Sequence, residues 1–360
     1  MADKFHQTII EQNFRKNIKW KNLKLAGLVG KGKHGTCFIY NDLKNPGQSY
    51  AVKLIKFDGS PSEKASIQKE IEILDFLSDF KMENYFFPSF YGYCQYVSHN
   101  PSDQHFYALV FEKASGDLRS LIKSRKSGLT FKENLALLEC LSKCLVFLQK
   151  NEKMHRDLKP ENILYFIDED NEVNFKITDF GEAKLKVGSD LTVRGTPKYF
   201  APEVNYCYLN GKSHQKIEEP YKIDIYSVGL IMIYVNLLEL PFKEIAGKNS
   251  LKRFKERDVN PFVKEKGPFD KKIMRAIHDV LHKFRRIKRG EKSMFKKILR
   301  NCLKYNPNQR YDPETLNEKI NALIVMHRKL KTADSEDNDE EEKTKERNHS
   351  DLEFSSKIRV

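Results

Sequence analysis

The sequence predicts an α+β fold of two lobes, a small lobe with an antiparallel β-sheet and one helix and a larger lobe that is mainly helical. Its 360 residues, 39% of them hydrophobic, can bury a sizeable core and suit two packed lobes better than one small module. The first half reads as short β-runs punctuated by glycines, and the second half carries apolar stripes at helical spacing. We expect an N-terminal extension over residues 1–22, the small lobe over 23–112, the large lobe over 113–330 and an acidic, disordered tail over 331–360.

The small lobe is predicted from its β-runs and one capped helix. The β-runs are Leu25–Gly30, Thr36–Tyr40, Ser49–Phe57 and His105–Glu112. Between the last two, Ser60 can cap a helix, Pro61 suits its first turn and Glu63 completes a capping box. The apolar residues of this helix recur at helical spacing and give it one buried face: Ile67, Ile71, Leu74 and Leu77.

The large lobe is predicted to contain a long helix near its start. Thr130 and Glu133 form a second capping box. An apolar stripe follows it: Leu135, Leu138, Leu141, Leu145 and Leu148. After Leu330 the apolar periodicity stops and Asp334–Glu342 is an acidic run, so we expect the helical lobe to end there.

The composition argues against secretion and against a membrane span. Met1–Asn22 mixes charged and polar residues, which excludes the apolar segment of a signal peptide. The most apolar stretch, Ile223–Leu240, is interrupted by four polar or charged residues and reads as a buried helix, so no transmembrane segment is expected. Six scattered cysteines form no CxxC pair and are expected to be reduced core residues. We therefore expect a cytoplasmic protein, with the nucleus as the alternative.

The net charge of +14 is unevenly distributed along the chain. Residues 332–360 carry ten acids and five bases, which leaves +19 on the rest. Lys243–Gly290 is long and basic, and it includes His282–Arg289. This segment could dock an acidic substrate, contact nucleic acid or form a solvated helix face. A solvated face is the first expectation and nucleic acid the last.

A glycine-rich turn joins the first two β-runs. Gly30, Gly32 and Gly35 form a GxGxxG pattern, which on its own is a weak signal. A dinucleotide site would need a helix directly after the third glycine, but Thr36–Tyr40 reads as a strand. A strand–turn–strand hairpin with glycines in its turn instead allows backbone amides to close over phosphates, because the glycines have no side chains to obstruct them.

Lys53 ends the tripeptide Ala51-Val52-Lys53 on the next β-run. A carboxylate from the following helix could hold its ammonium in place as a fixed charge for phosphates. Glu70 is the preferred partner because it precedes Ile71 on the apolar stripe. Glu72, the rival, points about 200° away around the helix.

The strongest signal is the run His155-Arg156-Asp157-Leu158-Lys159-Pro160-Glu161-Asn162. Asp157 can accept the proton of a substrate hydroxyl, and Lys159 can neutralise charge on a transferred phosphoryl group. Asn162 offers an oxygen to Mg²⁺. Downstream, Asp179-Phe180-Gly181 follows a β-run at Phe175–Thr178 and makes Asp179 a second magnesium ligand.

Together these motifs resemble the eukaryotic protein kinase family over about residues 25–325. The run Gly195–Glu203 resembles the family's substrate-docking loop and APE motif, and Asp224–Gly229 is similar to the start of its central buried helix, with Tyr226 in place of tryptophan. Arg310 lies where the family keeps an arginine that pairs with the APE glutamate, here Glu203. Glu203 and Arg310 are expected to stabilise the fold and to take no part in catalysis.

The resemblance implies ATP and Mg²⁺ as cofactors. Phe111 falls at the gatekeeper position, Glu112 to Ala114 form the hinge, and Asp117 is placed either to meet the ribose or to cap a helix. Cys37 replaces the usual valine over adenine and could be alkylated there. The residues implied to bind ATP are Gly30, Lys31, Gly32, Gly35, Cys37, Ala51, Lys53, Glu70, Phe111, Glu112, Ala114 and Asp117.

The resemblance also implies protein substrates and a mode of control. Lys159 with Thr196 in the docking loop resembles serine/threonine kinases. Thr192 is predicted as an activation-loop phosphosite, with Ser189 as the runner-up and Arg156 as the main phosphate ligand, beside Arg194 or Lys184. An upstream activating kinase is then an expected partner.

Two other classes of protein remain as alternatives. A pseudokinase scaffold usually lacks one of the residues that are present here as Lys53, Asp157 and Asp179. A basic nucleic-acid-binding protein would leave all of these motifs unexplained. An active protein serine/threonine kinase is therefore the prediction.

Overall fold

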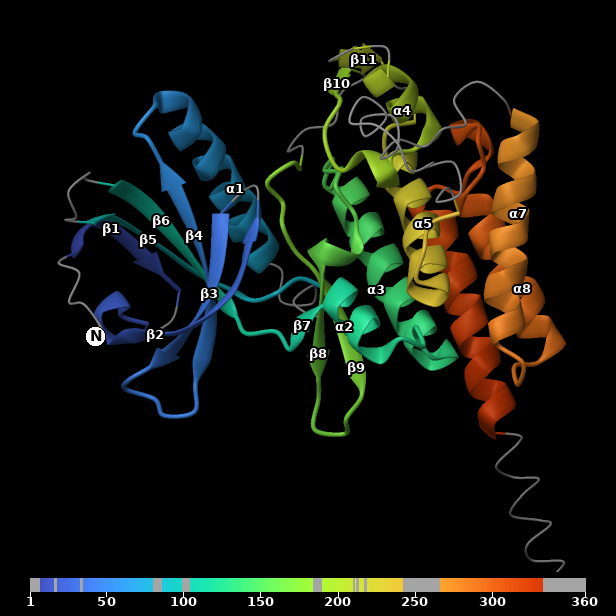
Figure 1. The fold of residues 1–360 in the computed structure, drawn as a ribbon, viewed down its shortest axis with the longest axis horizontal. Coiled ribbons are helices and arrows are strands. Elements are labelled where there is room, and N and C mark those ends of the chain that lie inside the picture. The colour runs from blue at the N-terminus through green and yellow to red at the C-terminus, as the bar shows by residue number, and fades with distance from the viewer. Residues whose placement is uncertain are drawn as a thin grey trace, which may run out of the picture.

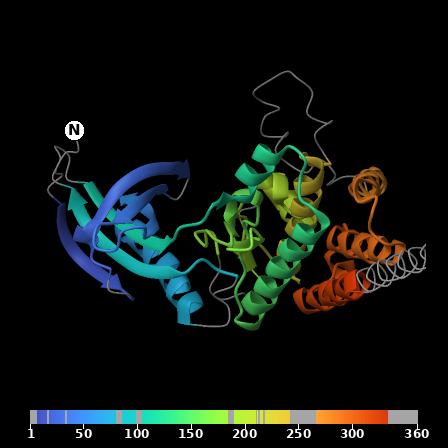
Figure 2. The same cartoon turned by 90° about the horizontal axis from the view of Figure 1, so that it is seen from below.

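The computed structural model describes residues 7–15, 18–32, 35–79, 86–98, 104–183, 190–209, 211, 214–216, 219–241 and 266–332. The acidic tail from residue 333 on, and residues 242–265 of the basic stretch, lie outside this part of the chain. Two lobes stand side by side, one built on a β-sheet and one mainly on helices (Figure 1). The view from below shows the same division (Figure 2). The predicted α+β class and the two lobes are confirmed.

The small lobe is a six-stranded antiparallel sheet in the order β1-β5-β6-β4-β3-β2. Its strands are β1 (Gln7–Phe14), β2 (Leu23–Gly32), β3 (Gly35–Asp42), β4 (Ser49–Phe57), β5 (Phe90–Ser98) and β6 (Gln104–Glu112). Strands β1 and β5 are not among the β-runs predicted from the sequence. The predicted N-terminal extension therefore contributes an edge strand to the lobe, because β1 pairs with β5.

The two faces of this sheet carry separate apolar clusters. On one face, Trp20 lies against Tyr40 and Tyr96, with ring centroids 5.4 and 5.5 Å apart, and Val52 is fully buried nearby. The other face packs against helix α1 (Pro61–Asp79). Because side chains alternate along a strand, the residues of β4 that face α1 include Lys53 and Ile55.

Helix α1 begins where the sequence predicts, although its cap differs in one detail. The Glu63 amide donates to Ser60 Oγ at 3.3 Å, as in a capping box. The Glu63 carboxylate, however, accepts from the Asp58 amide at 2.9 Å instead of the Ser60 amide, which donates to Asp58 Oδ1. The cap is thus shared between Ser60 and Asp58.

The large lobe is built around two buried helices. Its helices are α2 (Leu118–Arg125), α3 (Phe131–Lys150), α4 (Pro202–Leu209), α5 (Lys222–Leu237), α7 (Lys266–Lys283), α8 (Arg289–Cys302) and a last helix over residues 313–332. Short 3₁₀ turns occur at Trp20–Asn22, Pro160–Asn162, Pro197–Tyr199 and Pro307–Gln309. Helix α3 carries the predicted capping box of Thr130 and Glu133. Helix α5 is buried on nearly all sides, as predicted for the apolar stretch.

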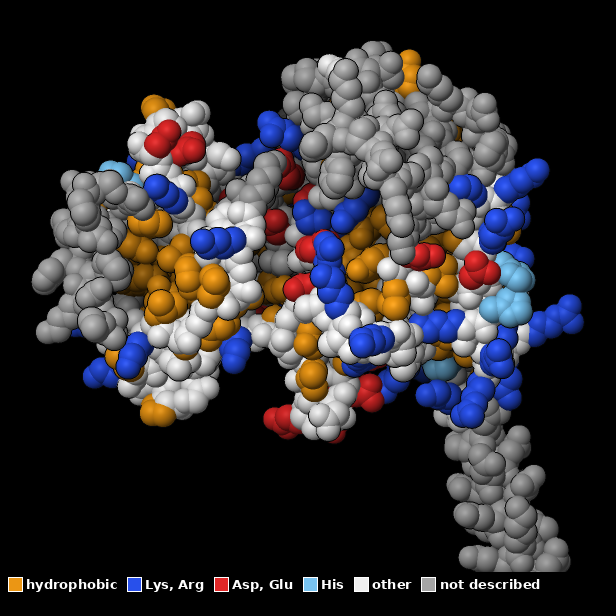
Figure 3. All heavy atoms as spheres, in the orientation of Figure 1, with side chains coloured by type: hydrophobic (Ala, Val, Ile, Leu, Met, Phe, Trp, Pro, Cys, Tyr) orange, Lys and Arg blue, Asp and Glu red, His pale blue; other side chains and the backbone are white. Residues whose placement is uncertain are grey.

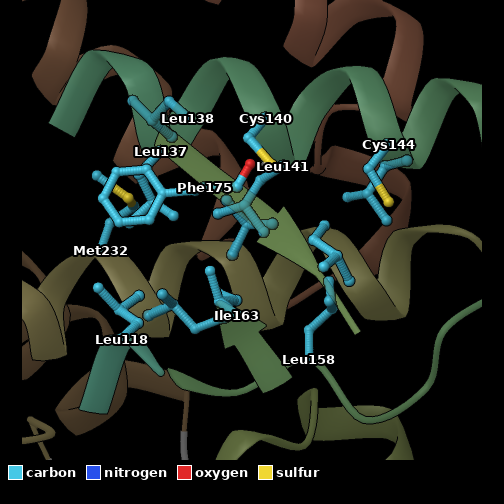
Figure 4. Packing of buried hydrophobic residues seen from close by; sticks show 14 of the residues in the cluster. Leu118, Leu137, Leu138, Cys140, Leu141, Cys144, Leu158, Ile163, Phe175 and Met232 are labelled. Atoms are coloured by element: carbon cyan, nitrogen blue, oxygen red, sulfur yellow. Dashed lines mark hydrogen bonds between the residues drawn. The ribbon is translucent and has the colours of Figure 1, made fainter. Parts of the chain in front are cut away.

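A small three-stranded sheet brings the functional loops onto this helical core. It consists of β7 (Gly116–Asp117), β8 (Ile163–Ile167) and β9 (Val173–Ile177), and β9 packs against α3. Cys140 donates its thiol to the carbonyl of Phe175 at 3.1 Å, and Leu158 and Ile163 lie in the same buried cluster (Figure 4). The loop before β8 is therefore fixed to the core by its own apolar residues.

A two-stranded sheet joins β10 (Asp190–Thr192) to β11 (His214–Lys216). The long connection at residues 205–221 supplies β11, a strand that is not predicted from the sequence. No helix in the described ranges combines the length and apolar character needed to cross a bilayer.

Candidate active site

The glycine-rich turn is a β-hairpin between β2 and β3. Lys31 pairs with Thr36 and Gly32 with Gly35, and the two residues at its tip lie outside the described chain. Gly35 has a φ of +139°, and a Cβ there would lie 2.6 Å from the Leu54 carbonyl oxygen, so only glycine fits. At Gly30 no described atom lies within 4 Å of such a Cβ. Packing does not demand glycine at residue 30, and the open space suits a ligand that approaches the backbone closely.

A cavity of about 780 Å³ borders this hairpin, and its lining extends from α1 to Tyr40 and Phe106, which pack with the apolar cluster of the other sheet face. Its lining includes Lys31, Gly32, Glu70 and Gly181. Acidic and basic side chains also gather where the two lobes face each other (Figure 3). The hairpin, the helix and the segment after β9 thus meet around one hollow.

Lys53 lies between two carboxylates from different parts of the chain. Its Nζ is 2.7 Å from Glu70 Oε1 on α1 and 3.1 Å from Asp179 Oδ1 after β9. Burial lowers the pKa of Lys53, but the two carboxylates outweigh it and raise the pKa above its ordinary value, so the ammonium stays charged. Glu72 is exposed, and the prediction of Glu70 as the partner is confirmed.

Asp157, Lys159 and Thr196 form a closed triangle of hydrogen bonds. Lys159 Nζ lies 2.5 Å from Asp157 Oδ2 and donates to Thr196 Oγ1 at 3.0 Å. The Thr196 hydroxyl in turn donates to Asp157 Oδ1 at 2.6 Å. A side-chain hydroxyl therefore already lies in hydrogen-bond reach of the predicted base and the predicted cation, which is the position a substrate hydroxyl needs.

The backbone under Asp157 is held by a buried carboxylate, Asp224, which the sequence motif indicates only as the start of a helix. Asp224 on α5 accepts from the amides of His155 and Arg156, both at 3.0 Å. Burial raises the pKa of Asp224, while His155 and the two amides oppose the rise. Arg156 has a φ of 65°, a strained conformation that these bonds hold in place.

His155 links the same loop to the segment after β9. Its Nε2 lies 3.0 Å from the Thr178 carbonyl and its Nδ1 lies 3.3 Å from the Asp157 amide. A carbonyl can only accept and an amide can only donate, so the neutral ring carries its proton on Nε2. The ring also packs against Phe180, whose centroid is 5.0 Å away.

Asn162 and Asp179, the two predicted magnesium ligands, come from segments that are bonded to each other. The Thr178 amide donates to the Asn162 carbonyl at 3.0 Å, which places Asp179 next to that residue. Asn162 Nδ2 donates to the Asp157 carbonyl at 2.9 Å, and this bond leaves the side-chain oxygen available to accept a cation. Asp179 has a φ of 65°, and Phe180 after it is buried against Phe87.

The two predicted ligands suit a magnesium ion that also binds a nucleotide better than a metal ion held by protein side chains alone. The described residues contain no group of three or more His, Cys, Asp or Glu placed to hold a metal. One carboxylate and one amide oxygen would leave the other positions to phosphate oxygens and water, as Mg²⁺ prefers. The residues present are therefore compatible with a nucleotide-bound ion.

The predicted adenine side of the site lies at the end of β6. Phe111 pairs in register with Ala51 and its ring lies 5.2 Å from that of Phe90. The Glu112 side chain accepts from the Ser89 amide at 2.7 Å and from Lys176 at 2.6 Å, so it ties β6 to β9 in the other lobe. Ala114 lies in the loop that follows β6.

Two of the predicted ATP-binding residues, Asp117 and Cys37, lie in well-defined surroundings at the start of α2 and on β3. Asp117 accepts from the Ser120 amide at 2.9 Å and caps α2, which was one of its two expected roles. Cys37 lies half-buried on β3 opposite Lys53. Burial raises the pKa of the Cys37 thiol, and the Lys53 charge partly offsets that rise.

The predicted phosphosite Thr192 ends β10 opposite His214. Its side chain, together with Lys184 and Ser189, lies outside the described residues. Arg156 Nε donates to the Glu182 carbonyl at 2.7 Å, and Arg194 lies 3.9 Å from the Glu182 carboxylate. Glu182 thus lies beside both of the arginines that are predicted to receive a phosphate, a role the sequence pattern does not reveal.

The scaffold pair of the large lobe is confirmed. Arg310 makes two bonds of 2.6 Å to the Glu203 carboxylate, and its guanidinium is fully buried. It also donates to the carbonyls of Lys222, Lys304 and Tyr305.

Comparison with known proteins agrees with this geometry. The model of the protein kinase domain matches residues 23–320. A probable myosin light chain kinase of Dictyostelium discoideum is 33% identical over 219 residues, which cover 59% of this chain and 62% of the relative. Serine/threonine-protein kinase 33 of Mus musculus is 30% identical, with 60% and 42% covered. Calcium-dependent protein kinase 4 of Plasmodium falciparum is 29% identical, with 74% and 46% covered.

The chain spans only part of these proteins. Across the first curated relatives that it matches, the covered share of the relative lies between 21% and 62%. The match to the family model, residues 23–320, contains the glycine hairpin, Lys53, Asp157 and Asp179.

Proposed function

Because the chain belongs to the protein kinase family, we propose that it is a protein serine/threonine kinase, which transfers the γ-phosphate of ATP to serine and threonine hydroxyls of proteins. The triangle of Asp157, Lys159 and Thr196 carries this proposal. In this triangle a carboxylate and an ammonium both form hydrogen bonds with one aliphatic hydroxyl, and the acceptor of a phosphoryl group requires the same pair of contacts.

In the proposed reaction Asp157 accepts the hydroxyl proton of the substrate and orients its oxygen toward the phosphorus atom. Lys159 lies on the same side and neutralises negative charge that grows on the transferred group. When the substrate hydroxyl enters, Thr196 either gives up its bonds to Asp157 and Lys159 or remains beside these two residues. The loop needs no rearrangement for this, because Asp224 and His155 already hold its backbone.

The other residues of the site are proposed to hold the nucleotide. The hairpin from Gly30 to Gly35 covers the phosphates, and Lys53 contacts them as a charge fixed by Glu70. Asp179 and Asn162 would hold Mg²⁺, which would offset the negative charge of the phosphates. Phe111, with the backbone from Glu112 to Ala114, would border the adenine.

Specificity for serine and threonine over tyrosine is supported by Lys159 and by its bond to Thr196. Lys159 Nζ bonds to Asp157, so the ammonium lies directly beside the base. A short aliphatic acceptor suits this site, whereas a tyrosine hydroxyl would arrive on a ring. The relatives named serine/threonine-protein kinase agree with this assignment.

Control by phosphorylation of Thr192 is proposed on the position of two arginines. Arg156 and Arg194 lie around Glu182, so a phosphate that arrives there meets cationic groups and displaces a carboxylate. An upstream kinase would add the phosphate. The proposed setting is the cytoplasm or the nucleus, and nucleic acid is not proposed as a partner of the catalytic site.

The test is a set of three peptides that differ only in the acceptor, which is serine, threonine or tyrosine. With ATP and Mg²⁺, the chain should phosphorylate the serine and threonine peptides and leave the tyrosine peptide nearly untouched. Lys159→Ala should abolish that transfer, whereas Lys153→Ala, which removes a lysine outside the loop, should retain it. Equal transfer to tyrosine would overturn the specificity, and no transfer to any peptide by protein pre-phosphorylated on Thr192 would favour a binding scaffold.

A further inference from the structure

The lower corner of the large lobe is strongly basic. Residues 271–300, from α7 through α8, carry twelve lysines and arginines against two acids. One of the two acids, Glu291, is buried and bonded to His327 at 2.6 Å, and the other, Asp279, lies next to His278. Blue side chains gather over these helices in the space-filling view (Figure 3).

The centre of this surface is the connection between α7 and α8, which we call the basic corner and define as Arg285, Arg286 and Arg289. All three side chains are exposed, and none forms an ion pair with an acid in the part of the chain that the structure describes. Three unpaired guanidinium groups within five residues repel one another, so an anion here would be stabilising.

The last helix passes beside the start of α8, where the basic corner ends. His327 contacts Glu291 in the first turn of α8, and a Cβ at Gly290 would lie 3.5 Å from Met326 Sδ. The helix is described to Thr332, only about 8 Å further along its axis. The acidic run Asp334–Glu342, seven acids in nine residues, begins two residues after this point in the sequence.

Length and charge both suit an intramolecular contact. Nine extended residues reach about 30 Å, and the 18 residues of α7 are about 27 Å long, so the run can follow the whole basic surface. Single exposed ion pairs contribute only about 0–1 kcal/mol each. A short tether, however, gives an effective concentration in the millimolar range, so several weak pairs suffice.

We propose that the acidic run Asp334–Glu342 docks on the basic corner as a built-in polyanion and keeps other acidic ligands off the α7–α8 surface. This inference is independent of the proposed catalytic function, because it concerns binding at a surface remote from Asp157. It gives a role to the basic surface of α7 and α8 and to the acidic run, neither of which takes part in the proposed catalysis.

The experiment measures binding of a fluorescent peptide that copies residues 333–345, by anisotropy at about 50 mM salt, where screening is modest. The full chain is compared with a full-length neutral-tail variant in which the seven acids of the run are changed to Asn or Gln. The neutral-tail variant should bind the peptide, and the wild-type chain should bind it about tenfold more weakly or worse, since its own tail competes at millimolar effective concentration. Equal binding by the two chains would overturn the proposal.

Two triple variants in the neutral-tail chain locate the contact. Arg285→Glu with Arg286→Glu and Arg289→Glu should weaken peptide binding about tenfold or more, which is the loss expected for removing several ion pairs. The control changes the net charge equally on exposed residues of the small lobe, with Lys21→Glu, Lys24→Glu and Lys44→Glu, and should leave binding unchanged. Equal losses in both triples would show attraction to net charge alone and refute the site.

The last experiment measures the binding of a labelled DNA duplex to the same two chains. The neutral-tail variant should bind it more tightly than the wild-type chain does, because the corner is uncovered. Equal DNA binding by both chains would mean that the tail does not occupy the surface. The unfolding midpoint of every variant is measured alongside, so a loss of folding is not counted as a loss of the site.

Discussion

At the scale of single residues, the charge of Lys53 depends on two carboxylates that reach it from opposite lobes. Glu70 belongs to α1 of the small lobe, and Asp179 follows β9 of the large lobe. The pair with Glu70 is the more buried of the two, since the carboxylate of Asp179 is 26% exposed and that of Glu70 is 9% exposed. Glu70 is therefore the group that fixes the ammonium.

Glu70→Gln should lower kcat/KM for phosphate transfer by about 10–100-fold, because a hydrogen bond to a charged group contributes about 1.5–3 kcal/mol. The amide keeps the shape of the side chain and removes its charge. Steady-state kinetics with a serine peptide measure this loss. The matched control is Glu72→Gln, on the exposed side of the same helix, which should change the rate by no more than about twofold. Similar losses in both variants would contradict the assignment.

Cys37 lies opposite Lys53, and its reactivity follows from that neighbour. Burial raises the pKa of the thiol, so little thiolate, the reactive form, is present at neutral pH. Iodoacetamide labelling of Cys37 should be slow at neutral pH and should accelerate as the pH rises toward and beyond the ordinary thiol range. Lys53→Met should slow it further, because the positive charge that lowers the pKa is gone.

Peptide mass spectrometry measures this labelling with and without ATP. Cys94, Cys140 and Cys302 serve as internal controls, because they are buried with pKa values raised to about 12 and should stay unmodified in the folded chain. Labelling at Cys37 that does not depend on pH, or that ATP fails to slow, would rule out its place over the nucleotide.

Much of the site could be predicted at this scale, because its residues are adjacent in the sequence or separated by a known helical phase. The apolar stripe alone predicts that Glu70, and not Glu72, is the partner of Lys53. The role of Asp224 could not be predicted, since it depends on α5 passing under a loop 68 residues earlier. The position of Glu182 between Arg156 and Arg194 is likewise set by tertiary contacts.

At the scale of elements, Arg310 connects three parts of the large lobe. It bonds to Glu203 on α4, to the carbonyl of Lys222 at the start of α5 and to the turn that precedes the last helix. Its guanidinium also lies over the ring of Tyr226, 5.0 Å from the centroid. Loss of this side chain would leave a carboxylate and several carbonyls without their donor.

Arg310→Met should lower the free energy of unfolding by about 3–5 kcal/mol, since removing one partner leaves the other charge largely buried and unpaired. Denaturant titration followed by circular dichroism measures the change. Arg300→Met removes an exposed arginine of α8 and should cost no more than about 0.5 kcal/mol. A loss at Arg310 as small as the loss at Arg300 would refute a structural role for the pair.

The elements themselves were predictable to different degrees. Thr130 and Glu133 form their capping box because both partners lie within one turn. Strand β1 could not be predicted, because an edge strand depends on its partner β5, about 80 residues away, more than on its own pattern. The same holds for β11, whose partner β10 lies in another loop.

At the scale of the whole molecule, the two lobes are joined by polar contacts that converge on the site. Lys53 with Asp179 links β4 to the segment after β9, and Glu112 with Lys176 links β6 to β9. The two-lobed division was predictable from the change of periodicity near residue 113. The place where the lobes touch was not, because each contact pairs residues more than 60 positions apart.

The central claim is that this arrangement transfers phosphate with Asp157 as the base, and Asp157→Asn tests it most directly. The variant should bind ATP with Mg²⁺ as the wild-type chain does, by calorimetry, and should lose about 10²–10⁴-fold in transfer to a serine peptide, the usual contribution of a general base. Asp170→Asn, in the exposed turn between β8 and β9, should retain full activity. Undiminished transfer by Asp157→Asn, or the same loss in both variants, would contradict the account.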